Sequence, residues 1–266
     1  MNFGKMQTIK QYLNFSDFQI HLRRSGNLGF PIVLLHQTPL SSKMFERTLP
    51  YLGKQMQAFA FDTPGYGHSS PLNNDISLDN YAYRISLAIE KIGLEKFAIA
   101  GFATGSALAV VLAQNLGDKV SHLILSGTPL LSEKEINFYK KNLPEFNISK
   151  DGSHLLDIWN NRINSYGAEG GLEQIQMVLE ESLCASGKIN YALEAVIKDN
   201  IQERLKLINQ KVLFLTLEND KLRSSNKKAL SIVQNAQEIE IYDSFPQYCW
   251  TNPKAYAKIV FNFVLD

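Results

Sequence analysis

The stretch "AIAGFATGSALAV", residues 98–110, is the most informative part of this sequence. An apolar run ends at the first glycine, and helix-forming residues follow the second, so the pattern predicts a strand that turns sharply into a helix. Gly101 and Gly105 flank the turn, and their missing side chains let strand and helix approach closely. Ala103 stands at the tip of the turn. The tip therefore carries a methyl group and no reactive side chain.

Strand-length apolar runs alternate with helical patterns on both sides of this stretch. The expected strands are 31–36, 57–62, 96–101, 120–127, 211–218 and 238–243, with a hairpin around 8–24, and the expected helices include 41–53, 77–93, 104–116 and 253–264. Near-continuous apolar strands separated by helices are typical of a parallel sheet that is buried on both faces. We therefore predict an α/β fold with a mostly parallel, doubly wound sheet.

The alternation stops between residues 131 and 206. This part contains helix-like segments around 132–141, 153–165, 171–184 and 189–208, and no strand-like run. An insertion at this point would lie over the carboxyl ends of the strands, where open α/β sheets bind ligands. We therefore expect a core of residues 1–130 and 207–266 and a helical cap of residues 131–206.

Composition excludes several classes of partner. The chain has 266 residues, with 27 basic and 26 acidic side chains and a net charge of +1, which gives no electrostatic footprint for nucleic acid. Its apolar runs are far shorter than the roughly 20 residues of a membrane span. Cys184 and Cys249 form no disulfide framework and have no metal-ligand spacing. With no secretory signal visible, we expect a cytoplasmic protein with a small-molecule partner, no metal and no cofactor; its oligomeric state stays open.

Four motifs in chain order resemble those of the α/β-hydrolase superfamily. They are "LLHQTPLSS" (34–42), "FDTPGYGHSS" (61–70), "GFATG" (101–105) and "LENDKL" (217–222). In that superfamily, such segments supply an oxyanion-hole amide, a glycine-rich turn, the nucleophile elbow and the triad acid. The resemblance extends over essentially the whole chain, and the helical insertion falls where the superfamily places its cap.

The resemblance assigns roles to individual residues. Ala103 occupies the nucleophile position, and the backbone amide of Thr104 would face the oxyanion together with an amide near Gln37 or Thr38. Asp220 would be the acid of the triad. Gln37 departs from the glycine that is usual at its position.

Two departures remove the covalent mechanism that the resemblance implies. Alanine at position 103 cannot form a covalent intermediate. The triad histidine should follow the last strand, where the chain reads "DSFPQYCWTNP" (243–253), and Ser244, Pro246 or Gln247 occupies its place. All five histidines, at positions 21, 36, 68, 122 and 154, precede the final strands. Only the acid of the triad is present.

Other residues are open to a structural and a functional interpretation. His36 either supports its loop through hydrogen bonds or transfers protons in the pocket. Asp220 is either a relic that caps a turn or pairs with a neighbouring cation, or a retained functional acid. We expect His21 on the surface and His68 in an exposed turn.

Three aromatic residues could line a pocket. Phe102 neighbours the elbow, and Tyr248 and Trp250 lie where the missing histidine loop would enter. Packing beneath the last helix is the alternative for the two that follow the last strand.

The sequence leaves three functions open. The first is an enzyme for a small, moderately apolar molecule that works without a covalent intermediate or cofactor, as a lyase, cyclase, isomerase or oxygenase. The second is a non-catalytic ligand-binding pseudoenzyme. The third is an ester or carbon–carbon hydrolase whose nucleophile has been deliberately replaced. Fold alone does not rank them, because one scaffold hosts many functions.

Overall fold

The computed structural model describes residues 6–73, 75–142, 147–166, 171–185 and 189–265. An eight-stranded sheet has the order β1-β2-β4-β3-β5-β6-β7-β8. Its strands are β1 (Ile9–Asn14), β2 (Gln19–Ser25), β3 (Phe30–Leu35), β4 (Met56–Phe61), β5 (Phe97–Phe102), β6 (Val120–Ser126), β7 (Lys211–Leu217) and β8 (Ala236–Ile241). β3 to β8 are parallel to their neighbours within this set, and only the pairings of β2 are antiparallel. The predicted mostly parallel α/β sheet is confirmed.

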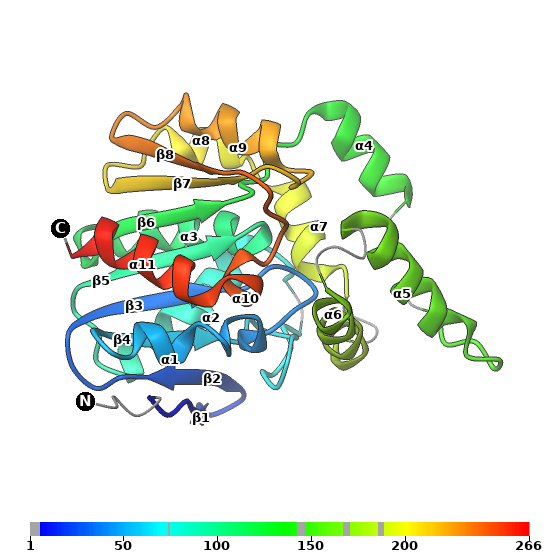
Figure 1. The fold of residues 1–266 in the computed structure, drawn as a ribbon, viewed down its shortest axis with the longest axis horizontal. Coiled ribbons are helices and arrows are strands. Elements are labelled where there is room, and N and C mark those ends of the chain that lie inside the picture. Colours follow the sequence, from blue (N-terminus) through cyan, green and yellow to red (C-terminus); the bar gives the residue numbers. More distant parts are fainter. Residues whose placement is uncertain (1–5, 74, 143–146, 167–170, 186–188, 266) are drawn as a thin grey trace.

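Helices cover both faces of the sheet (Figure 1). One apolar cluster packs α2 (Leu78–Lys91), α3 (Thr104–Leu116), α8 (Ile201–Leu205) and α9 (Arg223–Leu230) against one face. A second cluster packs η1 (Ser42–Phe45), α1 (Leu49–Leu52), α10 (Tyr248–Thr251) and α11 (Pro253–Val264) against the other. The central strands are buried from both sides, which explains their continuous apolar sequences.

Local signals set most of the helix boundaries. The hydroxyl of Ser77 caps α2 by accepting a hydrogen bond from the Asn80 backbone N–H at 3.3 Å. Gly117, at φ 53°, ends α3, and Pro253 begins α11. These three helices lie close to their predicted ranges.

Two predicted helices are each divided in the structure. The range 41–53 contains η1 and the separate α1, because Pro50 has no N–H to continue a helix and is tolerated only in a first turn. The range 189–208 contains α7 (Tyr191–Lys198) and α8, and the Asn200 side chain caps the second of them through the Glu203 N–H. α9 and α10 were not predicted, since the first is strongly polar and the second is a single turn.

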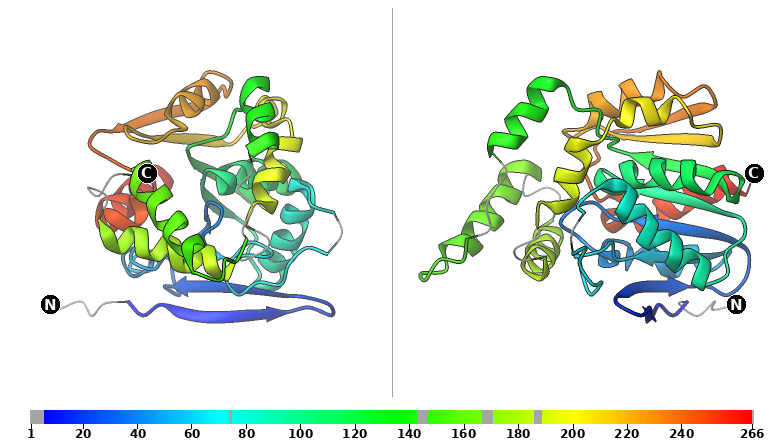
Figure 2. Two further views of the ribbon diagram at one scale, coloured as in Figure 1. Left: turned by 90° about the vertical axis from the view of Figure 1, so that its right-hand side faces the viewer. Right: turned by 180° about the vertical axis from the view of Figure 1, so that it is seen from behind.

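The segment between β6 and β7 is helical. It contains α4 (Glu133–Asn142), α5 (Ser153–Tyr166), α6 (Leu172–Cys184), α7 and α8. Figure 1 and the rear view in Figure 2 place α4, α5 and α6 beyond the carboxyl ends of the parallel strands. α6 packs Met177 and Val178 into the second apolar cluster, whereas α4 buries no residue. Helix α6 therefore packs in the same apolar cluster as α10, which follows the loop after β8.

Within the described parts of the chain, no helix combines the length and apolar character that a membrane crossing requires. The same residues contain no cluster of three or more His, Cys, Asp or Glu side chains that could hold a metal ion.

Candidate functional site

The turn between β5 and α3 has the backbone of a nucleophile elbow. Ala103 has φ 48° and ψ −113°, a region that side chains other than glycine rarely adopt. Its N–H donates to the carbonyl oxygen of Ser126 at the end of β6 at 2.9 Å. Ala103 is partly exposed, so the tip reaches solvent-accessible space. The strained geometry is present, although the side chain there is only a methyl group.

Two glycines allow this turn, as the sequence predicts. A Cβ on Gly105 would lie 2.3 Å from the carbonyl oxygen of Leu35, and one on Gly101 would lie 2.3 Å from the carbonyl oxygen of Gly105. Both contacts are with backbone atoms, which have no side-chain torsion with which to move away. Helix α3 can therefore approach β3 and β5 this closely only with glycine at both positions.

The loop after β3 lies against the elbow. The Thr38 N–H donates to the Thr104 hydroxyl at 2.8 Å, and the two threonine hydroxyls are 2.9 Å apart. Gln37 uses its carbonyl oxygen to accept from Leu40 N–H at 2.8 Å. The backbone N–H of Thr104 has no hydrogen-bond partner among the described residues. The structure therefore brings Gln37, Thr38 and Thr104 together. Among the described residues the Thr104 N–H has no acceptor, whereas the Thr38 N–H is satisfied by the Thr104 side chain.

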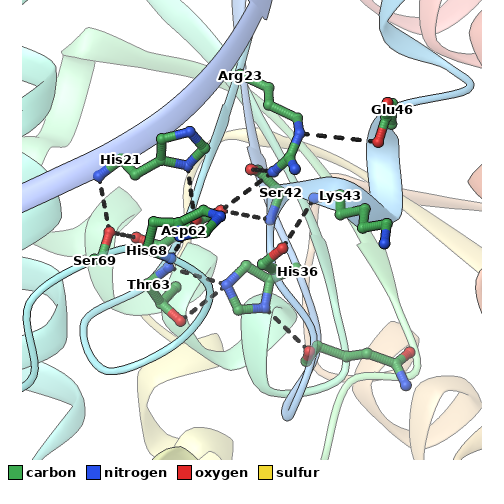
Figure 3. A network of polar contacts seen from close by, with 12 residues as sticks. His21, Arg23, His36, Ser42, Lys43, Glu46, Asp62, Thr63, His68 and Ser69 are labelled. Carbon is green, nitrogen blue, oxygen red and sulfur yellow. Dashed lines mark hydrogen bonds and ion pairs between the residues drawn. The ribbon is translucent and has the colours of Figure 1, made fainter. Parts of the chain in front are cut away.

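His36 is held at both ring nitrogens. It is 1% exposed, and its Nδ1 lies 3.0 Å from the carbonyl oxygen of Gln37. Its Nε2 accepts from the Thr63 backbone N–H at 3.0 Å, as Figure 3 shows, so the proton belongs on Nδ1. Burial lowers the pKa of His36, because desolvation disfavours the charged ring. This geometry favours the structural interpretation of His36, as a neutral link between the loops that follow β3 and β4.

Asp220 lies beside the carboxyl end of β6, the strand whose last residue, Ser126, accepts the hydrogen bond from Ala103. Its Oδ1 accepts from the Leu222 N–H at 2.8 Å, and its Oδ2 lies 2.8 Å from the place of a Cβ on Gly127. Burial raises the pKa of the Asp220 carboxyl. Neither of the two cations next to it in the sequence pairs with it: Lys221 contacts Ser165, and Arg223 pairs with Glu240. Asp220 is thus a desolvated carboxyl that caps a turn and has no ion pair in the described structure.

The loop after β8, where the resemblance leads us to expect the triad histidine, is held by polar contacts. Gln247, fully buried at φ 61°, accepts a hydrogen bond at its Oε1 from the Gln174 side chain of α6. The same Gln174 side chain donates to the carbonyl oxygen of Pro246 at 2.8 Å. Ser244 accepts from Glu218 N–H at 3.1 Å. Helix α6 therefore anchors the loop, a role for Gln174 that no local sequence motif indicates.

Two of the three aromatic residues that were expected to line a pocket pack against other side chains. The Phe102 ring packs between Phe45 and Tyr256, with centroids 5.9 and 5.6 Å away, on the face covered by α11. Trp250 lies under the Arg47 guanidinium at 4.2 Å and borders a surface cavity. Strand alternation directs Phe102 into the core, opposite to the turn that follows it. Tyr248 is buried in the same cluster as Phe102.

Known proteins share this fold. The family model for the alpha/beta hydrolase fold matches residues 31–149. A bromoperoxidase from Bacillus anthracis superposes with a TM-score of 0.82 at 16% identity, covering 98% of this chain and 100% of that one. This chain has the α/β-hydrolase fold. An esterase from a Rhodococcus species has a TM-score of 0.79 at 18% identity, covering 98% and 99%. The fold that the four motifs imply is confirmed.

Curated relatives of this hydrolase-fold protein match mainly in part. An uncharacterized hydrolase of Saccharomyces cerevisiae is 32% identical over 108 residues, which is 40% of this chain and 37% of the relative. The matched segment covers 37% to 54% of the length of the first curated relatives. A bifunctional esterase/perhydrolase of Acinetobacter calcoaceticus is 25% identical over 241 residues, covering 83% of this chain and 86% of that protein.

The hydrolase-fold core also contains a buried polar network that the sequence did not reveal (Figure 3). Asp62 is fully buried and accepts from Ser42 N–H at 2.7 Å and from His68 N–H at 2.9 Å. His21 lies 2.8 Å from the same carboxylate through Nδ1 and is 1% exposed. The expectation that His21 lies on the surface was wrong, because pairing with β4 covers β2 and Asp62 supplies its polar partner. His68 is exposed, as predicted.

Proposed function

We propose that this α/β-hydrolase-fold protein binds a small, moderately apolar molecule over the elbow and acts on it without a covalent intermediate or a cofactor. The observation that carries this proposal is Ala103, which keeps the elbow backbone but has no nucleophilic atom. Several relatives are named esterases or hydrolases. An acyl transfer through a covalent intermediate has no nucleophilic atom at position 103 of this chain.

The chemistry that remains is proton transfer next to a polarised oxygen. The open N–H of Thr104 supports binding of a carbonyl or enolate oxygen, and Asp220 is the proposed proton carrier. A carboxyl whose pKa is raised by burial is suited to acid–base catalysis near neutral pH. Enolate chemistry of the lyase, cyclase, isomerase or cofactor-free oxygenase type fits these groups. His36 is assigned to holding the loop, since both of its ring nitrogens are engaged.

We propose that residues 131–206 form a cap over this site and that 1–130 and 207–266 form the core. Two contacts support this division. Gln174 of α6 holds the loop of Gln247, and the Ala192 N–H at the start of α7 donates to the Tyr66 hydroxyl at 3.0 Å. Tyr66 belongs to the glycine-rich turn after β4, so both contacts join the insertion to loops at the carboxyl ends of the strands.

Substitution Asp220→Asn tests the proposed proton carrier. Burial raises the pKa of Asp220, so the ionised carboxylate is less favourable in the folded state than in the unfolded chain. The ionised carboxylate therefore lowers the free energy of unfolding increasingly as the pH rises. We expect the variant to be more stable than the native chain at pH 7 by roughly 0.5–2 kcal/mol, and this difference to vanish in acid. Urea unfolding at several pH values measures it.

Turnover gives the second readout for Asp220→Asn. Ligands found by thermal shift in a library of neutral apolar carbonyl compounds are incubated with protein and followed by mass spectrometry. We expect turnover by the variant to fall at least 100-fold, while binding is retained. Exposed Asp118→Asn is the matched control and should change neither property. Loss of stability at pH 7 in Asp220→Asn would instead assign the carboxylate a structural role.

A second candidate function is non-catalytic ligand binding. The observation that favours it is the Thr104 hydroxyl, which already satisfies the Thr38 N–H that an oxyanion would use. The same incubations distinguish the candidates, because a pure binding protein stabilises under its ligands and returns them chemically unchanged.

Substitution Ala103→Ser tests the idea that the chain is a disarmed ester hydrolase. We expect no hydrolysis of p-nitrophenyl acetate above that of the native chain, because a serine here has no imidazole base within the described site. Histidine is then added at position 244, 246 or 247 in turn. An ester hydrolase restored by any of these pairs, detected by p-nitrophenol release, would contradict the proposed function. A burst of product from Ala103→Ser alone would contradict it as well.

A further inference from the structure

Thr104 places a side-chain oxygen on an amide that the proposed site needs for its ligand. Its Oγ1 lies 2.8 Å from the Thr38 nitrogen and 2.9 Å from Thr38 Oγ1. Both residues are partly exposed, so a ligand can reach this pair. A hydroxyl oxygen at this distance from an amide is in the position that a bound carbonyl oxygen would take.

The hydroxyl pair is also connected to the helical insertion. Tyr66 is in hydrogen-bond contact with Thr38 and accepts from the Ala192 N–H of α7 at 3.0 Å. Burial raises the pKa of Tyr66 to about 12, so this phenol stays protonated and keeps one hydrogen to donate. The position of Thr38 is therefore set from two sides, by α3 through Thr104 and by the insertion through Tyr66.

We propose that the Thr104 hydroxyl is an internal competitor that occupies the Thr38 N–H in the absence of a ligand, and that it selects ligands carrying a carbonyl-type acceptor oxygen. Such an oxygen replaces Thr104 Oγ1 on the Thr38 N–H, and the threonine side chain turns to another rotamer. This inference rests on the proposed function in assuming that ligands bind over the elbow.

Ligand selection follows from the Thr38 N–H, which loses its hydrogen-bond partner when a ligand displaces the Thr104 hydroxyl. A ligand without an acceptor that displaces the Thr104 hydroxyl leaves the Thr38 N–H desolvated and unpaired, which lowers affinity by roughly tenfold or more. A ligand with a carbonyl oxygen restores the hydrogen bond. Thr104 is thus a specificity-determining residue that acts through the Thr38 amide.

The variants Thr104→Val and Thr104→Ser test whether the Thr104 hydroxyl occupies the Thr38 N–H. Valine keeps the shape and removes the acceptor, whereas serine keeps the hydroxyl and serves as the matched control. Amide hydrogen exchange of Thr38, measured by NMR without any ligand, should be slow in the native chain and in Thr104→Ser. It should be about tenfold faster or more in Thr104→Val. Equal exchange in all three proteins would overturn the inference whatever the ligand proves to be.

Two probes of the same carbon skeleton test the selection, namely the ketone 4-phenylbutan-2-one and the hydrocarbon butylbenzene. We expect Thr104→Val to bind the ketone about 5–20-fold more tightly than the native chain, since no hydroxyl competes for the amide. Affinity for butylbenzene should change less than twofold. Equal gains for both probes would overturn the inference. Absence of binding at the elbow by either probe in every protein would overturn the proposed function, while the exchange rates still decide the role of Thr104.

Discussion

Gly105→Ala should unfold or severely destabilise this protein, with a loss of at least about 4 kcal/mol in the free energy of unfolding. The added Cβ would lie 2.3 Å from the Leu35 carbonyl oxygen and 2.5 Å from that of His36. Both oxygens belong to the backbone at the end of β3, so relief requires α3 to move away from the centre of the sheet. That movement would open the most densely buried layer of the core.

The melting temperature is the direct measurement for Gly105→Ala. A loss of this size corresponds to at least about 10 °C in a chain of this length. Gly117→Ala is the matched control, because its Cβ meets nothing within 4 Å and only its φ of +53° opposes the change. We expect about 1 kcal/mol there. Similar losses for the two variants would show that close packing at the elbow is not what requires glycine.

Asp62→Asn is the second large effect that we expect, about 3–5 kcal/mol of folding free energy. The carboxylate accepts from two backbone amides, those of Ser42 and His68, and contacts the His21 ring at Nδ1. Asparagine retains one acceptor oxygen and turns an amide group toward the remaining donors. A buried donor without a partner is costly because water cannot replace the lost bond.

The pH dependence of stability provides an independent check on Asp62. Burial alone would raise the pKa of this carboxyl, but the hydrogen bond and charge of His21, with Ser42 and His68, lower it from 3.8 to about 2. The ionised carboxylate therefore stabilises the fold by about 2 kcal/mol above pH 4. This stabilisation is lost as the pH falls through about 2.

Urea unfolding between pH 6 and pH 2 should therefore show the native chain approaching Asp62→Asn in stability as acid is added. Asp118→Asn, an exposed substitution, should follow the native curve throughout. Parallel curves for Asp62→Asn and the native chain would contradict the assigned role of the carboxylate.

Much of this fold can be predicted from the sequence because its signals are local. Continuous apolar strands, the Ser77 cap and the two elbow glycines each act within a few residues of themselves. Pro50 shows the limit of periodicity, since the apolar pattern around it suggests one helix and the missing N–H divides it. The short polar helix α9 was missed because nothing in its composition distinguishes it from a loop.

Candidate site residues are less predictable because their partners are distant in the chain. Thr38 and Thr104 are 66 residues apart, and Gln174 and Gln247 are 73 apart. No sequence window indicates that one hydroxyl satisfies an amide in the other loop, or that Gln174 of α6 binds the loop after β8. The motifs predict that Gln37, Thr38 and Thr104 lie close together, but they do not predict the hydrogen bonds between them.

By itself, the sequence determined the α/β-hydrolase fold, the elbow and the absence of a nucleophile at Ala103. These depend on residue identity, periodicity and local backbone preference, which short-range sterics impose. Only the tertiary structure decided which polar groups are satisfied and which are desolvated. His21 is a buried partner of Asp62, 41 residues away, and Asp220 has no ion pair among the residues that the structure describes. Burial and pairing are properties of the packed interior, where the loss of water makes each hydrogen-bond partner decisive.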